Sequence, residues 1–220
     1  MSNHTSTSDD REYFASCLAG LEHLLSEELR ALGARRVRPL SSGVAFFGGE
    51  REALRACLWS RLASRITLVA GRVGARDADE LYAGAAALPW GELIRRGASL
   101  AVRARGANER LRNTTFTALK VKDAVVDALR GAWGERPSVN ADDPDAVVEV
   151  TLRGDKATIS LDLAGSSLYR RTSLEDEARA PLSQAVAVSA GLLALAGWDA
   201  AARDGARLVD PQCADGVLAC

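Results

Sequence analysis

The sequence predicts an α+β protein with two small units and the start of a third. Three observations support this fold class. Strand-like and helix-like runs alternate over residues 12–73, a long amphipathic helix and a hairpin pattern follow over residues 113–165, and a separate apolar helix begins near residue 181. A chain of 220 residues can form two small domains, each with its own hydrophobic core.

The first unit is expected over residues 12–70, and its elements follow the order βαββαβ. Leucines at helical spacing mark its first helix, and Gly33 is placed to end that helix. This order is that of the split βαβ, or ferredoxin-like, arrangement. The strand-like runs cover 12–17, 35–40, 43–47 and 65–73, and the helix-like runs cover 19–34 and 50–62.

The second unit is expected over residues 71–171. Its clearest helix covers residues 113–131, where Asn113 or Thr114 can act as the N-cap and Gly131 can end the helix. A helix over 77–88 and a strand over 99–106 precede it, and a hairpin over 145–165 follows it.

Both units are expected to bury apolar side chains between helices and strands. The side chains predicted to be fully buried are Leu24, Leu25, Leu119, Val125, Ile159 and Leu161. The four tryptophans, Trp59, Trp90, Trp133 and Trp198, are expected to serve in core or inter-domain packing.

The two ends of the chain differ from its middle. Residues 1–11 are polar and predict a disordered tail with no signal peptide, and residues 172–180 predict a linker. Residues 181–220 are expected to form the first helix and the first strand of a domain that is cut short. The four cysteines lack metal-like spacing, which predicts no metal site and a reducing, cytoplasmic location.

The stretch from Arg103 to Lys122 carries six basic side chains and one acidic side chain, Glu109, in a chain of formal net charge −1. A helix N-terminus flanked by arginines can bind phosphate, although charged runs are more often merely solvated. Because Phe116 is the one aromatic residue in the stretch, contact with a nucleic-acid backbone or a folded RNA shape is favoured over reading of single-stranded bases. The candidates for RNA binding are Arg103, Arg105, Arg110, Arg112, Asn113, Lys120 and Lys122.

The final residues, ARLVDPQCADGVLAC, predict a strand that runs into a loop. Asp210 and Gly216 suit the first turn of a doubly wound sheet, where an acidic side chain can hold an amine or a hydroxyl and a glycine lets a ligand approach. An ordinary strand-to-helix turn explains the same pattern equally well. Cys213 is expected to be a small buried core residue, because no catalytic partner accompanies it. The chain has no Ser-His-Asp set and no zinc spacing, so no catalytic residue is predicted.

Five segments of the chain, taken together, show a resemblance to one protein family. They are YFASCLAGLEHLLSEELRALGA, ACLWSRLASRITL, DADELYAGAAALPW, LRNTTFTALKVKDAVVDALR and ATISLDLAGSSLYRR. Together they resemble the N-terminal half of bacterial 23S ribosomal RNA guanine-N2-methyltransferases. Members of that family carry a ferredoxin-like domain beside THUMP, an RNA-binding module. The resemblance extends over about residues 12–220 and implies a Rossmann-like methyltransferase domain after the THUMP domain.

The resemblance also implies S-adenosylmethionine as cofactor. The family motif Asp-Pro-x-Cys-Gly-Ser-Gly-Thr is matched at Asp210, Pro211, Cys213 and Gly216. The chain departs from the motif at Ala214, Asp215 and Val217, and from the preceding family linker at Thr172 and Gln184.

By this resemblance, the chain is the RNA-docking part of an enzyme that methylates the exocyclic amine of a guanine in 23S ribosomal RNA. Its expected partner is structured RNA, either 23S ribosomal RNA or a ribosomal assembly intermediate, with no membrane and no metal. The family's Asn-Pro-Pro-Tyr-type motif does not occur in the 220 residues, so this chain alone is expected to be inactive. The alternatives are a stand-alone or degenerate THUMP module that binds RNA without catalysis, and a different RNA-modifying enzyme such as a thiouridine synthase.

Overall fold

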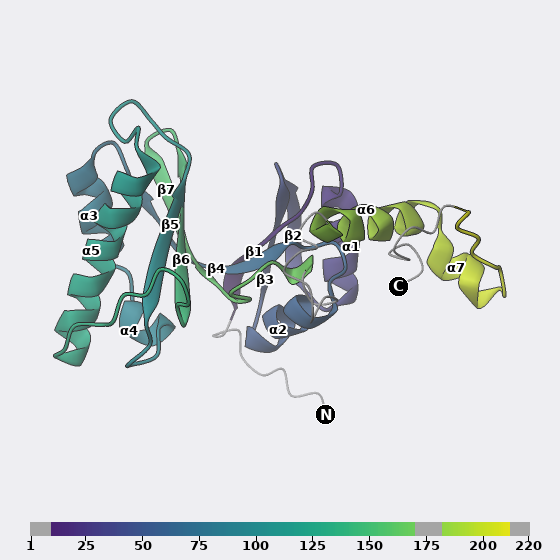
Figure 1. Ribbon diagram of the computed structural model, residues 1–220, viewed down its shortest axis with the longest axis horizontal. Coiled ribbons are helices and arrows are strands. Elements are labelled where there is room, and N and C mark those ends of the chain that lie inside the picture. The colour runs from purple at the N-terminus through teal and green to yellow at the C-terminus, as the bar shows by residue number, and fades with distance from the viewer. Residues whose placement is uncertain (1–9, 170–181, 212–220) are drawn as a thin grey trace. The chain divides into compact units, whose positions relative to one another are not determined.

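The computed structural model describes residues 10–169 and 182–211, with the side chains of 182–185 left out. The chain forms two compact units (Figure 1). The first unit is Met1–Ile66 together with Ser166–Cys220, and the second unit is Thr67–Gly165.

The first unit confirms the predicted order βαββαβ. Its strands follow the order β2-β3-β1, and the first residues of β4 lie next to β1, where the Ser16 hydroxyl donates a hydrogen bond of 3.3 Å to the Arg65 carbonyl. The elements are β1 (Arg11–Ser16), α1 (Glu22–Ala31), β2 (Arg35–Leu40), β3 (Gly43–Gly48), α2 (Glu50–Trp59) and the start of β4 (Arg65–Gly74).

The core of the first unit is made by α1 and the central strands. Leu25 and Leu29 of α1 are fully buried, and Tyr13 of β1 stacks on Phe46 of β3 with ring centroids 5.3 Å apart. Helix α2 contributes only the small residues Ala53 and Ala56 to this core. Its large side chains lie outside, so of the two expectations for Trp59, core or inter-domain packing, the core position is wrong. The exposed large side chains of α2 are Leu54, Leu58 and Trp59.

The second unit is a four-stranded sheet with all its helices on one face (Figure 1). The strand order is β4-β7-β6-β5, with β5 parallel to β6 and the other pairs antiparallel. Its further elements are α3 (Ala78–Ala86), α4 (Trp90–Leu93), β5 (Leu100–Arg105), α5 (Thr114–Trp133), β6 (Ala146–Arg153) and β7 (Lys156–Asp162).

The core of the second unit lies between this sheet and helices α3, α4 and α5. Leu100, Val150 and Ile159 project from the strands, and Val125 and Leu129 meet them from α5. Trp90 begins α4, which the sequence did not predict. Its ring is buried, and its indole Nε1 donates a hydrogen bond of 2.7 Å to the Ala85 carbonyl.

Three of the six predicted core side chains are fully buried, namely Leu25, Val125 and Ile159. Leu24 and Leu161 are only partly buried. Leu119 is 50% exposed, so its predicted burial is wrong. Each residue turns an α-helix by about 100°, so Leu119 points about 200° away from both Thr117 and Val121, which face the core.

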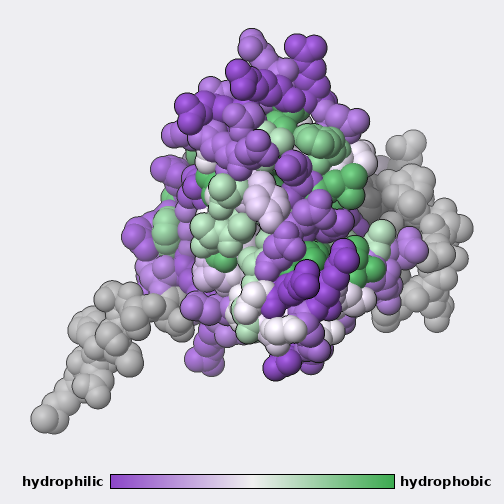
Figure 2. All heavy atoms as spheres, turned by 90° about the vertical axis from the view of Figure 1, so that its left-hand side faces the viewer, coloured by the Kyte–Doolittle hydropathy of each residue, from purple (hydrophilic) through white to green (hydrophobic). Residues whose placement is uncertain are grey.

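Phe116, one turn before Lys120, is also 46% exposed. The side of the molecule that carries α3 and α5 is mostly hydrophilic, and apolar side chains interrupt it at several places (Figure 2). The apolar residues of α5 therefore occupy two faces of the helix, and only one of these faces packs on the sheet.

Two helices, α6 (Leu182–Leu195) and α7 (Trp198–Arg203), follow in the first unit. A Cβ at Gly191 would lie 2.8 Å from Leu21 Cδ2, so α6 passes very close to the start of α1. The strand predicted from residue 206 onward is absent, since residues 206–210 have no regular secondary structure. A strand needs a neighbour to pair its backbone groups, and no described strand pairs with this segment. In the part of the chain that the structure describes, no helix has both the length and the apolar character needed to cross a membrane.

Two truncations in α5 test which face of the helix is buried. Leu129→Ala should lower the free energy of unfolding by about 2–5 kcal/mol, because Leu129 is fully buried in the core. Leu119→Ala should change it by less than about 0.5 kcal/mol, because its side chain is largely in solvent. Urea denaturation measures both values, and a Leu119→Ala loss as large as that of Leu129→Ala would contradict the packing described here.

Candidate nucleic-acid interface

The loop of residues 106–113, which joins β5 to α5, is organised by the side chain of Asn108. Its Nδ2 donates to the Ala75 carbonyl at 2.7 Å and to the Gly154 carbonyl at 3.1 Å. Its Oδ1 accepts from the backbone amides of Arg110 at 3.1 Å and Leu111 at 2.7 Å. One amide group therefore joins the loop to the end of β4 and to the β6–β7 turn.

Two neighbours of Asn108 restrict the same loop. The Leu111 side chain is buried in the core of the second unit, which anchors the loop on the helix side. Gly106 has φ +82°, and a Cβ there would overlap the Leu152 carbonyl, so only glycine fits. The sequence analysis did not identify Asn108. Its position two residues after Gly106 in a polar loop is the turn-forming pattern that could have indicated it.

The loop presents Arg110 and Arg112 at the N-terminus of α5. Arg110 is 73% exposed, and its guanidinium forms a loose ion pair with a carboxylate oxygen of Asp77 at 3.8 Å. Arg112 Nε donates a hydrogen bond of 2.8 Å to the Glu109 carbonyl, which orients the guanidinium without neutralising it. Asn113 is the N-cap of α5, as predicted, and its side chain accepts from the Phe116 amide at 3.1 Å.

Lys120 lies where α5 packs against α3. Its Nζ is 3.5 Å from a carboxylate oxygen of Asp79 and 5.5 Å from the centre of the Tyr82 ring. The Tyr82 hydroxyl donates a hydrogen bond of 2.6 Å to Asp127, and this bond raises the pKa of Tyr82 above its ordinary value. Lys120 is therefore positioned by an acid and an aromatic ring, and its ammonium remains partly accessible.

The other predicted basic residues point elsewhere. Lys122 pairs with Asp123 at 2.8 Å, and two residues separate it from Lys120 by about 200° around α5. Arg103 and Arg105 alternate with core-facing residues of β5, so they project from the sheet face opposite the helices. Arg105 forms an ion pair with Glu149, whose side chain is only 9% exposed.

The structure therefore does not bring the six basic residues to one place. It gathers Arg110, Arg112 and Lys120, with Asn113, along the loop and the first two turns of α5. The expectation of little opposing acid also needs correction, because Asp77 and Asp79 of the α3 N-terminus lie beside Arg110 and Lys120. Both ion pairs are exposed and longer than 3.4 Å, so each contributes little energy and can be exchanged for an external anion.

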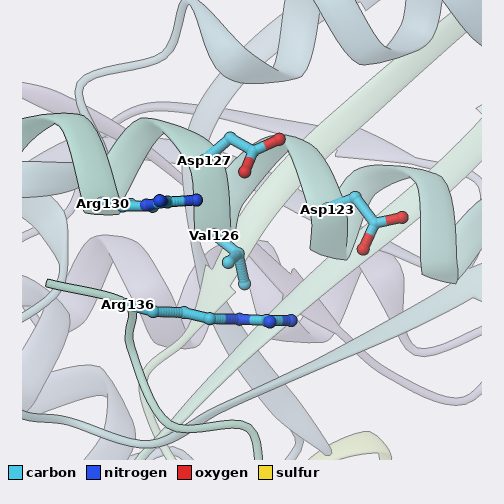
Figure 3. A pocket seen from close by; sticks show the side chains of 5 residues that line it. All are labelled: Asp123, Val126, Asp127, Arg130 and Arg136. Atoms are coloured by element: carbon cyan, nitrogen blue, oxygen red, sulfur yellow. The ribbon is translucent and has the colours of Figure 1, made fainter.

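A hollow of about 140 Å³ lies farther along α5. The side chains of Arg130 and Arg136 extend in the same direction on either side of Val126, and the carboxylates of Asp123 and Asp127 complete the lining (Figure 3). A second hollow in the same unit, of about 230 Å³, is lined by residues that include Arg95 and Asp145. Both are smaller than the cavities of roughly 300–1,000 Å³ that ordinarily hold a cofactor-sized ligand.

Of the residues that the sequence assigns to a cofactor, Asp210 and Pro211 are described, and Cys213 and Gly216 lie outside the described residues. The described part of this segment does not fit a cofactor pocket. Residues 206–210 form no strand, and Val209 is exposed. The doubly wound sheet whose strand ends would hold S-adenosylmethionine is therefore not formed by the described residues.

Comparison with known proteins identifies two domains in the chain. Residues 12–67 match the RlmL ferredoxin-like domain, and residues 75–162 match the THUMP domain. The first match covers the βαββαβ order of the first unit, and the second covers the loop and α5 that carry the basic residues.

Curated relatives cover nearly the whole chain. It is 44% identical over 207 residues to the ribosomal RNA large subunit methyltransferase K/L of Cellvibrio japonicus, a match to 94% of the chain and 27% of that protein. It is 44% identical over 208 residues to the protein of the same name from Syntrophotalea carbinolica, a match to 94% of the chain and 29% of that protein. The chain thus spans less than a third of the length of these relatives.

Two solved structures are similar. SMU.472, a candidate methyltransferase solved in complex with SAH, matches with a TM-score of 0.72 and 26% identity over 86% of this chain and 49% of that chain. TrmN from Thermus thermophilus matches with a TM-score of 0.62 and 28% identity over 84% of this chain and 54% of that chain.

Substitution of Asn108 tests whether its amide organises the basic loop. Asn108→Asp retains an acceptor for the Arg110 and Leu111 amides but removes the donor and faces two carbonyl oxygens. The free energy of unfolding should fall by about 1–3 kcal/mol, and amide exchange at Leu111 should accelerate. Asn113→Asp is the matched control, because aspartate also caps a helix, and it should be nearly neutral. If Asn108→Asp is as stable as Asn113→Asp, the organising role is wrong.

Proposed function

We propose that the chain is the ferredoxin-like and THUMP region of a protein of the ribosomal RNA large subunit methyltransferase K/L family, and that it docks structured RNA for such an enzyme. The observation that carries this proposal is the placement of Arg110 and Arg112 on a hydrogen-bonded loop at the N-terminus of the twenty-residue helix α5. This loop lies within the part of the chain that matches the THUMP domain.

The chemistry of the loop suits phosphate. Guanidinium groups bind phosphate oxygens through two parallel hydrogen bonds, and the positive end of the α5 dipole adds to the attraction. A backbone phosphodiester carries one negative charge, as a carboxylate does, but it can accept two close hydrogen bonds from Arg110, whereas the exposed Asp77 carboxylate lies 3.8 Å away and holds Arg110 only weakly. Lys120 extends the positive surface by one further phosphate along α5. The other three basic residues point in other directions and are assigned at most a peripheral role in RNA binding. They are Arg103, Arg105 and Lys122.

We further propose the substrate and cofactor of the whole enzyme. The relatives' name indicates large-subunit ribosomal RNA, and 23S ribosomal RNA in an assembly intermediate is the proposed partner, in the cytoplasm. The similarity to a methyltransferase solved with SAH supports S-adenosylmethionine as methyl donor. The resemblance seen in the sequence adds a guanine exocyclic amine as the proposed acceptor. In this proposal the present residues supply RNA docking, and groups outside this chain supply catalysis.

A second function is a THUMP module that binds RNA with no associated chemistry. The lack of regular secondary structure at residues 206–210, where the cofactor-binding strand was expected, favours it for the chain by itself. The two functions share the same RNA surface and differ only in methyl transfer.

The RNA surface is tested by removing two of its charges. Arg112→Ala with Lys120→Ala should weaken binding to a structured ribosomal RNA fragment. It should also reduce the slope of log affinity against log salt by about 1.4–1.8, since each lost phosphate contact removes 0.7–0.9. Filter binding or fluorescence anisotropy between 50 and 300 mM KCl, that is, over roughly a sixfold range of salt, gives the slope.

The matched control is Arg38→Ala with Arg51→Ala, which removes the same charge from exposed positions in the first unit. Equal effects of the two double variants would show that net charge, and not this surface, governs binding. An unchanged slope for Arg112→Ala with Lys120→Ala would exclude the surface from the RNA site.

The cofactor is tested by isothermal titration of the 220-residue chain with S-adenosylmethionine. We expect no binding tighter than about 100 μM, which corresponds to about −5.5 kcal/mol, because too few pocket walls are present to offset the cost of fixing the ligand. A tighter constant would show that the residues present form a complete pocket.

A further inference from the structure

Helix α5 exposes two large apolar side chains beside the basic loop. Phe116 and Leu119, here called the α5 apolar ridge, are 46% and 50% exposed and lie in the first two turns of the helix. Burial of the exposed half of each side chain would be favourable, because it removes apolar surface from water.

Two cationic side chains lie close to the ridge in the chain. Lys120 is four residues after Phe116 and therefore lies next to it on the same side of the helix. Arg112 lies in the loop just before Asn113, the N-cap of α5, and its guanidinium donates to the Glu109 carbonyl. A ligand that covers the Phe116 ring therefore lies beside Lys120 and near the end of the loop that carries Arg112.

The chemistry of this arrangement identifies the occupant. It must offer a flat apolar face of about the size of a phenyl ring, with negative charges close to it. A nucleobase with its two neighbouring phosphates has this pattern, and aromatic side chains stack on bases of any sequence. In a duplex the faces of the bases are covered by their neighbours, so only an unpaired base can stack on the ring.

We propose that the α5 apolar ridge binds an unpaired nucleobase of the RNA, with the base stacked on Phe116 and its edge on Leu119. The flanking phosphates are held by Arg112 and Lys120. This inference rests on the proposed RNA-docking function and adds a substrate class to it, namely RNA with a single-stranded segment. It also replaces the expectation that the basic stretch contacts a nucleic-acid backbone or a folded RNA shape in preference to single-stranded bases.

A protein partner fits the ridge less well. Two side chains provide far less than the area of about 1,000 Å² that a specific protein interface requires. The cation next to Phe116, Lys120, matches a phosphate, and the acid next to Leu119, Asp123, is paired with Lys122 at 2.8 Å.

The test compares two RNAs with the full 220-residue chain. One is a blunt-ended duplex, and the other is the same duplex with a five-nucleotide single-stranded extension that contains 2-aminopurine. The wild-type chain should bind the extended RNA more tightly and quench the 2-aminopurine fluorescence. Phe116→Ala should weaken binding of the extended RNA by about 5- to 150-fold, the range for loss of one stacked base, and should leave binding of the blunt duplex nearly unchanged.

Two variants control for folding and for apolar surface in general. Phe116→Tyr keeps the ring and should retain both affinity and quenching. Trp59→Ala removes a larger aromatic side chain that is 70% exposed on α2 of the first unit, and it should change neither. Because Phe116 is exposed, Phe116→Ala should keep the thermal midpoint of the wild type, which is checked by circular dichroism.

Three results would overturn the inference. Phe116→Ala could bind the extended RNA as well as wild type does, it could weaken both RNAs equally, or Trp59→Ala could have the same effect as Phe116→Ala. An unaltered RNA affinity together with altered self-association would make the ridge a protein contact. A wild-type chain that binds neither RNA would instead contradict the proposed function, and the inference with it.

Discussion

The four hydrogen bonds of the Asn108 amide are the interaction on which the candidate interface depends. They join the end of β4, the β6–β7 turn and the basic loop, which are far apart in the sequence. A long polar loop would otherwise sample many conformations, and each ordered residue costs conformational entropy of about 1–2 kcal/mol. Because the protein meets this cost when it folds, Arg110 and Arg112 can bind an anion with less further loss of freedom.

The surface that results combines a fixed backbone with weakly held charges. Arg110 and Lys120 face carboxylates of α3 at 3.8 and 3.5 Å, and these pairs lie largely in solvent. Such pairs keep the side chains extended and discourage non-specific association, yet they exchange readily for phosphate. Arg105 illustrates the opposite case, since its partner Glu149 is buried and the pair holds Arg105 on the sheet. The depth of the acidic partner therefore distinguishes Arg105 from Arg110.

Much of the fold could be predicted from the sequence, because its signals are local. The βαββαβ order, the β6–β7 hairpin and the capped helix α5 all follow from periodicity and from turn residues such as Gly154 and Asn113. The burial of Leu119 could not be predicted correctly, because α5 has apolar residues on two faces and periodicity does not say which face meets the sheet. The acids beside Arg110 and Lys120 were missed for a related reason, since they come from α3 through tertiary packing.

The strand predicted from residue 206 onward failed because a strand depends on a neighbour, and a local pattern carries no information about whether that neighbour is present. Asn108 was overlooked because an asparagine in a loop resembles many solvated ones, and only the positions of Ala75 and Gly154 show its role. The sequence therefore predicts the basic residues of the candidate site and its helix cap. It does not predict the hydrogen bonds and neighbouring acids that position those residues.

The most direct test of this account is a chemical-shift map of the full chain during titration with a ribosomal RNA fragment. Backbone amide spectra recorded by heteronuclear NMR would assign each perturbation to a residue. The account predicts that the largest shifts fall on residues 106–120, from the basic loop through the first two turns of α5. Largest shifts on α2 or α6 of the first unit, with residues 106–120 unaffected, would contradict it.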